Sequence, residues 1–304
     1  MTPANDHPNE RTGILFAAGS YAFWGFMPLY WKLFDGLGPL ELTSHRVFWC
    51  AIFCVVVTLG RGRFAHLVGI AKRPRVLAPL IATSLLITAN WTIFIYTVTT
   101  HQLVEAALGY YLTPLVSIVL GVTLLGEKVS TLRMAAIGLA TVGVVIQASQ
   151  LGHIPWIAPA LALSFGFYGY LRKLTPVDSL DGLTVETVFL FPATAAYIGY
   201  LAWAGVGAFP PAGARTDALL VIAGPLTAIP LALFAAGARR VRMTTLGFLQ
   251  YLSPTLTLLM ATLMLGEPFT FINAITFAFV WSGIALLSLE GRFRREAVVE
   301  PAEL

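Results

Sequence analysis

The stretch LTSHRVFWC, residues 42–50, places a histidine beside an arginine inside an otherwise apolar segment. Ionisable side chains at membrane depth are costly, so they stay there where a partner, a wet cavity or a function stabilises them. His45 could titrate near neutral pH and carry protons. Arg46 could meet a carboxylate, either one of the chain's own or one on a ligand. The two residues therefore indicate proton, ion-pair or anion chemistry inside a hydrophobic helix.

Two acidic residues could balance such charges. Glu105 lies about one turn into its apolar segment, at a depth similar to that of Arg46, so the two could form an ion pair or line a wet vestibule. Arg46 could instead snorkel to the lipid headgroups without any further role. Glu186 lies near the start of another apolar segment, where Arg172 or Lys173 could neutralise it, or where it could carry a proton.

Neutral polar and aromatic side chains supply further candidates for a central cavity. Asn90 and Trp91 lie well inside one apolar segment, where an amide either bonds a neighbouring helix or faces a substrate. Aromatic faces suit flat, apolar or cationic organic molecules, although such rings also pack in bundles without any ligand. Trp31 fits an interfacial belt. The remaining candidates are Trp24, Tyr111, Tyr168, Gln250 and Tyr251.

The elements that position these residues are membrane helices. Of 304 residues, 57% are hydrophobic and 11% charged, whereas a soluble domain carries about a quarter charged residues. The polar start of the chain lacks the pattern of a cleavable signal, so we expect the first apolar segment to be retained. Runs of about twenty apolar residues predict an all-α polytopic membrane protein with ten transmembrane helices. They span residues 12–33, 40–60, 76–98, 103–125, 132–149, 154–171, 183–204, 218–238, 244–265 and 269–289.

The basic residues orient these helices. If the N-terminus is cytoplasmic, sixteen Lys and Arg residues fall on the inner side, two on the outer side, and Arg46 within a helix. Cytoplasmic loops of membrane proteins are enriched in Lys and Arg, and the reversed topology would lose this distribution. We therefore expect both termini, with the tails 1–11 and 291–304, in the cytoplasm. The net charge of +4 then reflects topology and indicates no nucleic-acid partner.

The two halves of the chain resemble each other. The matching segments are FWGFMPLYWKL (23–33) with SFGFYGYLRKL (164–174), LTSHRVF (42–48) with LTVETVF (183–189), and YLTPLVSIVLGVTLLGE (111–127) with YLSPTLTLLMATLMLGE (251–267). Their nearly constant offset predicts two five-helix repeats, residues 12–149 and 154–290. Because five is odd, the second repeat must be inverted in the membrane. Inverted repeats are typical of secondary transporters, with the substrate site near the midplane.

Prolines inside the segments predict kinks, because each removes a backbone hydrogen bond. Pro28, Pro114 and Pro254 are the kink candidates. Pro114 and Pro254 occupy equivalent positions of the two repeats, so we expect matching bends around the central site.

With these motifs located, the chain resembles the RarD family of the EamA-type drug/metabolite transporter superfamily over residues 12–290. The motifs that carry the resemblance are SYAFWGFMPLYWK, ELTSHRVFW, ITANWTIFIYTV, HQLVEAALGYYLTPLVSIVLG, SFGFYGYLRK, GLTVETVFLFP and GFLQYLSPTLTLLMATLMLGEPF. The resemblance implies a ten-helix inverted-repeat carrier of bacterial inner membranes. Relatives elsewhere in the superfamily export amino acids, other metabolites or drugs, and the branch is named for a link to chloramphenicol sensitivity. The resemblance supplies no substrate contact.

We expect a secondary transporter that exports small organic solutes by alternating access between its halves. Arg46 and Glu105 would line or gate the outer side, and Glu186 with Arg172 the inner side. A proton gradient or the substrate's own gradient would supply the energy. The alternatives are a membrane-embedded enzyme, or a structural or regulatory membrane protein without transport.

Several chemistries have no motif in the sequence. There is no Walker loop, no H-E-x-x-H or G-x-S-x-G motif and no Cys/His cluster. We therefore expect no enzyme activity, no cofactor and no metal. The expected partners are a small organic substrate and the lipid bilayer. A proton as coupling ion or no coupling ion, and a monomer or a homodimer, stay open alternatives.

Overall fold

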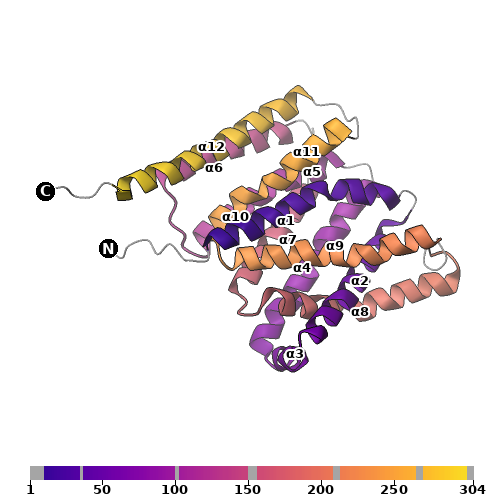
Figure 1. Cartoon of the computed structure of the whole chain (residues 1–304). Helices are drawn as coiled ribbons and strands as arrows, with labels where there is room; N and C mark the ends of the chain where they lie inside the picture. The colour runs from indigo at the N-terminus through magenta and orange to yellow at the C-terminus, as the bar shows by residue number, and fades with distance from the viewer. Residues whose placement is uncertain are drawn as a thin grey trace.

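The computed structural model describes residues 10–34, 37–99, 103–149, 156–207, 213–264 and 270–299, and these residues form helices and short connections without any strand (Figure 1). The helices are α1 (Glu10–Trp31), η1 (Lys32–Phe34), α2 (Pro39–Gly60), α3 (Phe64–Ala71), α4 (Pro74–Thr99), α5 (Leu103–Thr123), α6 (Thr131–Ala148), α7 (Ile157–Leu174), α8 (Ser179–Ala204), α9 (Ala214–Ala238), α10 (Met243–Gln250), α11 (Leu252–Met264) and α12 (Phe271–Val299). The expected all-α class is therefore confirmed.

Several of these helices are long and apolar enough to cross a bilayer. Among the described residues, six segments meet this criterion, and two shorter apolar helices lie beside them. The six are Pro39–Gly60, Pro74–Phe94, Thr131–Ala148, Ser179–Ala204, Ala214–Ala238 and Met243–Met264. Many of their large apolar side chains face outward, for example Val145 and Trp203. This pattern is consistent with a polytopic membrane protein, since lipid takes the place of water around such a surface.

Two elements differ from the sequence expectation. The connection between the second and third expected helices contains a further short helix, α3, whose Ile70 packs against Leu80 and Val177. The ninth expected helix is divided into α10 and α11 at Tyr251. Pro254 accounts for this division. In a continuous helix its ring would clash with the backbone carbonyl of Gln250, four residues earlier. By contrast, α5 continues through Pro114 without interruption, and the side chain of Pro28 lies outside the described residues.

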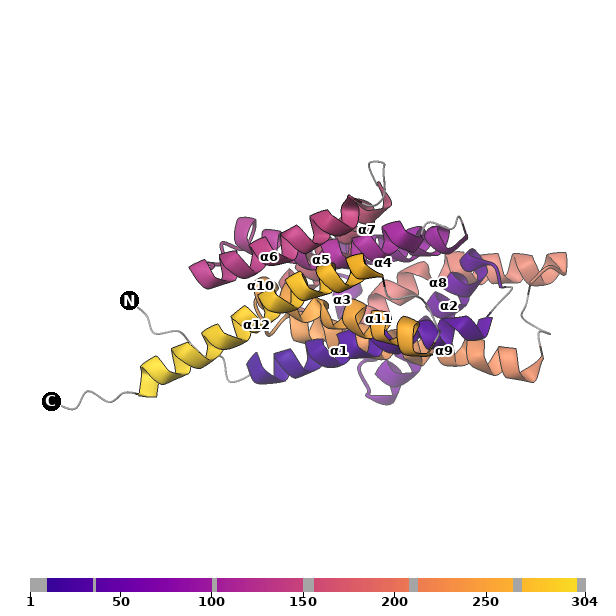
Figure 2. The ribbon, with the colours of Figure 1, turned by 90° about the horizontal axis from the view of Figure 1, so that it is seen from above.

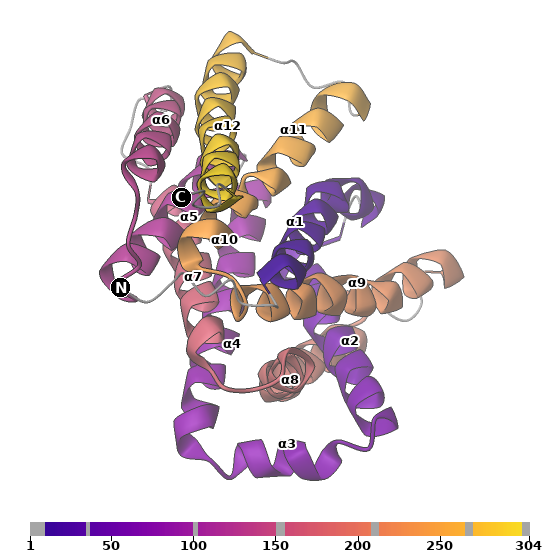
Figure 3. The ribbon, with the colours of Figure 1, turned by 60° about the vertical axis from the view of Figure 1, so that its left-hand side comes forward.

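The arrangement of the helices sets which segments meet. Helices α6 and α12 lie side by side at one edge of the bundle, and α3 joins α2 to α4 at the opposite edge (Figures 1 and 3). Helix α8 contacts α2, α3 and α4 there (Figure 3). The start of α1 and the end of α12 lie at the same end of the bundle (Figures 1 and 2).

Small residues let α6 and α12 approach closely. A Cβ atom at Gly283 would lie 2.8 Å from the carbonyl oxygen of Ala136, and one at Gly143 would lie 3.1 Å from that of Thr276. Such close backbone contacts are a common way of packing membrane helices. The small-residue stretch of α6 therefore makes an internal contact through Gly143, while Gly138 on the same helix has no neighbour within 4 Å.

This packing predicts a difference between two glycine substitutions. Gly283→Ala should lower the free energy of unfolding by about 1–3 kcal/mol, because the added methyl overpacks the contact with α6. Gly138→Ala should leave stability unchanged or raise it, since alanine favours the helix. Thermal unfolding in detergent measures both. Equal melting temperatures for the two variants would contradict the described packing of α6 on α12.

Candidate functional site

Arg46 lies between two tryptophan rings. Its Cζ atom is 4.3 Å from the ring centroid of Trp31 on α1 and 4.5 Å from that of Trp91 on α4. Its Nε donates a long hydrogen bond, 3.4 Å, to Oγ1 of Thr227 on α9. A cation above the face of a tryptophan ring is stabilised by cation–π attraction. Four helices thus fix this side chain within the bundle.

The two Nη atoms form the outer edge of this guanidinium. Among the described residues, neither Nη atom of Arg46 has a hydrogen-bond partner, and neither is a fully buried orphan. No described carboxylate forms an ion pair with it. The expected pairing with Glu105 concerns a side chain that lies outside the described residues.

A cluster of aromatic rings links α1, α7 and α9. Trp24 lies with its ring centroid 5.5 Å from that of Phe165 and 5.8 Å from that of Phe234. Tyr168 stacks on Phe234 at 5.6 Å, and Tyr21 meets both Trp24 and Phe234. Trp24 and Trp91 are both half-buried against the same apolar core. The structure therefore places two candidates, Trp24 and Tyr168, in one aromatic layer.

Other polar candidates connect helices. Asn90 donates through Nδ2 to the carbonyl oxygen of Leu161, 2.9 Å, and to Oγ of Ser164, 3.0 Å, which ties α4 to α7. Gln250 accepts a hydrogen bond of 2.9 Å from Ser117, which ties α10 to α5. Both amides therefore serve helix contacts in this structure.

Tyr111 and Tyr251 belong to a second apolar cluster, distinct from the one against which Trp24 and Trp91 pack. The Tyr251 hydroxyl is buried and has no hydrogen-bond partner among the described residues. His45 is also buried, with 1% of its surface exposed. The structure brings neither tyrosine to the aromatic layer.

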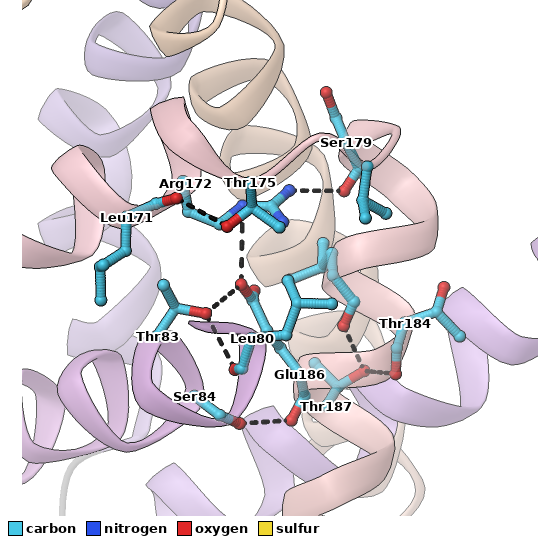
Figure 4. Close-up of polar contacts among 12 residues, drawn as sticks. Leu80, Thr83, Ser84, Leu171, Arg172, Thr175, Ser179, Thr184, Glu186 and Thr187 are labelled. Atoms are coloured by element: carbon cyan, nitrogen blue, oxygen red, sulfur yellow. Dashed lines mark hydrogen bonds and ion pairs between the residues drawn. The ribbon is translucent and has the colours of Figure 1, made fainter. Parts of the chain in front are cut away.

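A buried ion pair joins the end of α7 to the start of α8. Nε of Arg172 is 3.5 Å from Oε1 of Glu186, and their side chains are 1% and 2% exposed (Figure 4). Oε1 also accepts a hydrogen bond of 2.6 Å from Thr83 on α4, and Nη2 of Arg172 donates to the carbonyl oxygen of Ser179 at 3.0 Å. Gly182 leaves room for this guanidinium, because a Cβ there would collide with Nη1.

The same region holds a second set of polar contacts, those of Arg63 and His66 with Asp181, which we call the α3 clasp. Nη2 of Arg63 is 2.5 Å from Oδ2 of Asp181, and Nε2 of His66 is 3.3 Å from the same oxygen. Asp181 is almost fully buried at the start of α8. Beside it, Thr58 on α2 and Thr184 on α8 share a hydrogen bond of 3.0 Å. The first turns of α8 are therefore fastened to α2, α3 and α4.

Several of these residues escaped the sequence analysis. Thr227, Phe165 and Phe234 have no charge or motif to mark them. Asp181 and Arg63 lie near the ends of apolar segments, where charged residues are common and do not indicate a contact. Trp31 was expected at the interface but stacks on Arg46. Only the pairing of Glu186 with Arg172 had a sequence signal, namely two opposite charges near adjoining helix ends.

Comparisons with known proteins place these features in a family. The EamA-like transporter family matches the chain twice, over residues 11–148 and 155–289. An uncharacterized transporter of Vibrio cholerae is 42% identical over 292 residues, 96% of each chain. Protein RarD of Escherichia coli is 37% identical over 94% of this chain and 96% of its own length. A Pseudomonas aeruginosa protein named "Chloramphenicol-sensitive protein RarD" is 30% identical over 90% of this chain and 92% of its own.

A protein of known crystal structure has a similar fold. It superposes with a TM-score of 0.70 over 93% of this chain and 99% of its own, at 18% sequence identity.

The buried ion pair predicts strongly unequal effects of single and double substitutions. Arg172→Met should lower the free energy of unfolding by about 3–5 kcal/mol, because it leaves the Glu186 carboxylate buried without a counter-charge. The double variant Arg172→Met/Glu186→Leu should recover much of that loss. Arg61→Met, at an exposed arginine, should change stability by about 0.5 kcal/mol or less. Chemical denaturation in detergent tests this, and strictly additive effects would contradict the pair.

Proposed function

Because the chain belongs to the EamA-like transporter family, in the RarD branch of the drug/metabolite transporter superfamily, we propose that it is a secondary transporter of small organic solutes. It is a multi-pass protein of the bacterial inner membrane. Its two halves alternate between states open to one side and the other, and net movement is export. Catalysis and a purely structural role are the rejected alternatives, since the named relatives are transporters.

The pattern of helix contacts supports two inverted repeats. With α1, α2, α4, α5 and α6 matched to α7, α8, α9, α10–α11 and α12, contacts occur in equivalent pairs. Helix α1 contacts α9 as α7 contacts α4, and α1 contacts α11 as α7 contacts α5. Helices α2 and α8, α5 and α10, and α6 and α12 each contact their own counterpart. A two-fold relation between the halves accounts for all these pairs, as in other inverted-repeat carriers.

The single observation that carries the mechanism is the fastening of α8 to the first half. The α3 clasp and the bonds of Thr83 and Thr58 all join the second half to helices of the first half at one end of the bundle. Lys and Arg residues concentrate at this end, so it is the cytoplasmic end by the positive-inside rule. In this proposal both termini are cytoplasmic, and the fastening of α8 supports a state closed toward the cytoplasm.

Opening the inner side requires these contacts to break. Oε2 of Glu186 has no hydrogen-bond partner among the described residues, so a proton could be held there without displacing another donor. Protonation would remove the negative charge that Thr83 of the first half and Arg172 both contact, and so weaken the contact between the halves. We therefore favour the proton as coupling ion, with Glu186 as its carrier.

Cysteine accessibility tests the alternating mechanism without knowledge of the substrate. Cys50 and Cys54 are buried and are first replaced by serine. Thr184→Cys, at a position 1% exposed, should then react slowly with a membrane-impermeant maleimide added to inside-out vesicles. Adding Arg63→Gln should raise this rate several-fold, because loss of the α3 clasp favours the inward-open state.

Val145→Cys provides the control, since it lies on an outward-facing apolar surface away from the clasp. Its reaction rate should not respond to Arg63→Gln. A Thr184→Cys rate that is unchanged by Arg63→Gln, or equal from both sides of the membrane, would contradict the proposed gate.

A further inference from the structure

We infer that α3 and the basic residues beside it bind anionic phospholipids of the cytoplasmic leaflet. This interaction goes beyond transport itself and uses the orientation proposed above, in which α3 lies at the cytoplasmic end. Three features carry it: the place of α3 between two membrane spans, the charge of the segment that contains it, and the apolar face that it exposes.

Helix α3 lies at the level where membrane helices meet the lipid headgroups. Two candidate spans, Pro39–Gly60 and Pro74–Phe94, flank it, and only residues 61–63 and 72–73 separate it from them. It runs crosswise between the end of α2 and the start of α4 at the edge of the bundle (Figure 3). A chain that leaves the hydrocarbon region and re-enters it over so few residues stays in the polar boundary of the bilayer. The helix therefore lies along the membrane surface.

The segment around α3 carries positive charge without an acidic residue. Residues 61–75 read RGRFAHLVGIAKRPR, with five Lys and Arg residues and no Asp or Glu. One of the five, Arg63, contacts Asp181. The other four are exposed: Arg61, Lys72, Arg73 and Arg75. A basic cluster directly beside a membrane span attracts the anionic headgroups of the inner leaflet.

Other basic residues of the same end make contacts within the protein. Lys173, Arg239 and Arg242 each donate a hydrogen bond to a backbone carbonyl of a neighbouring segment. Arg172 pairs with Glu186. These charges stabilise contacts between helices, whereas the exposed residues of segment 61–75 face outward, where headgroups lie.

The exposed face of α3 is apolar. Phe64, Val68 and Ala71 follow one another at i, i+4 and i+7, so they share one side of the helix. Phe64 is 61% exposed and Val68 is 36% exposed, while Ile70 on another side is buried against the protein. Interfacial helices insert such an apolar side at the boundary of headgroups and acyl chains. A phospholipid matches both features of this surface, since it offers an anionic headgroup and an apolar chain.

The same helix supplies part of the α3 clasp. Arg63 directly precedes α3 and His66 lies in its first turn, and both contact Asp181. Lipid on the exposed face therefore acts on the segment that provides these two side chains. The composition of the inner leaflet is thereby linked to the proposed gate.

The rival explanation is that the basic residues only orient the chain in the membrane, as those of cytoplasmic loops do. In that case α3 would contact zwitterionic and anionic lipids in proportion to their amounts. Comparison of two lipids around one protein separates the two explanations, and it does not depend on whether a charge variant folds.

The experiment is fluorescence quenching in lipid nanodiscs. Cys50 and Cys54 are replaced by serine, and a bimane label is attached at Ala65→Cys, an exposed position of α3. The discs contain equal amounts of phosphatidylglycerol and phosphatidylcholine. In one series an increasing share of the phosphatidylglycerol carries a nitroxide on its acyl chain, and in the other series the phosphatidylcholine does.

We expect half-maximal quenching at a nitroxide-labelled share that is about fivefold lower for phosphatidylglycerol, because headgroup attraction enriches this lipid at α3. Val145→Cys, on the outward-facing surface of α6, provides the control and should show equal shares for the two lipids. Equal shares at Ala65→Cys, or the same preference at Val145→Cys, would overturn the inference.

Charge variants then assign the preference to α3. Lys72→Gln/Arg73→Gln should reduce it to about twofold or less, since half of the exposed basic residues are removed. Lys128→Gln/Arg240→Gln removes the same charge from exposed positions outside segment 61–75 and should leave the preference unchanged. A preference that survives Lys72→Gln/Arg73→Gln would overturn the assignment.

Failure of this inference can be told apart from failure of the proposed function. If Thr184→Cys accessibility responds to Arg63→Gln while the label on α3 shows no lipid preference, only the lipid site is wrong. If the label shows the preference while accessibility never changes, the lipid site stands and the alternating mechanism is wrong.

Discussion

The structure depends above all on the burial of an arginine and a glutamate together, Arg172 and Glu186, where neither reaches water. An isolated charge in such surroundings would cost several kcal/mol, so each requires the other. The requirement extends to their neighbours: Thr83 must donate to the carboxylate, and Gly182 must leave space for the guanidinium. In this way one electrostatic constraint fixes the relative positions of α4, α7 and α8.

Charged side chains are stabilised by different contacts at the two ends of the bundle. At the basic end, Asp181 and Glu186 each face cations, and α8 is fastened to the other half of the chain. At the other end, Arg46 lies over the rings of Trp31 and Trp91 and donates a long hydrogen bond to Thr227. The contacts between the halves described above are thus concentrated at the basic end, which suits a carrier that is closed there.

The sequence predicted the buried charged residues, because a charged residue inside a long apolar segment is unusual. It anticipated Arg46 as a polar feature within the membrane and Glu186 beside Arg172, and it anticipated the all-helical class. It did not anticipate Trp31 and Thr227 as neighbours of Arg46, or Arg63 as a partner of Asp181, because those contacts join segments far apart in the chain. The division at Tyr251 was also missed, although Pro254 was marked, since a proline inside a helix can bend it or end it.

The most direct test of the account measures whether the two halves separate at the cytoplasmic end. Spin labels at Val68 on α3 and Leu174 at the end of α7 are exposed and belong to different halves. Pulsed electron spin resonance in lipid nanodiscs would report the distance between them with and without Arg63→Gln. The account predicts one short distance when the α3 clasp is intact and a second, longer population when Arg63→Gln removes it. A single distribution that stays unchanged with Arg63→Gln and with Asp181→Asn would contradict it.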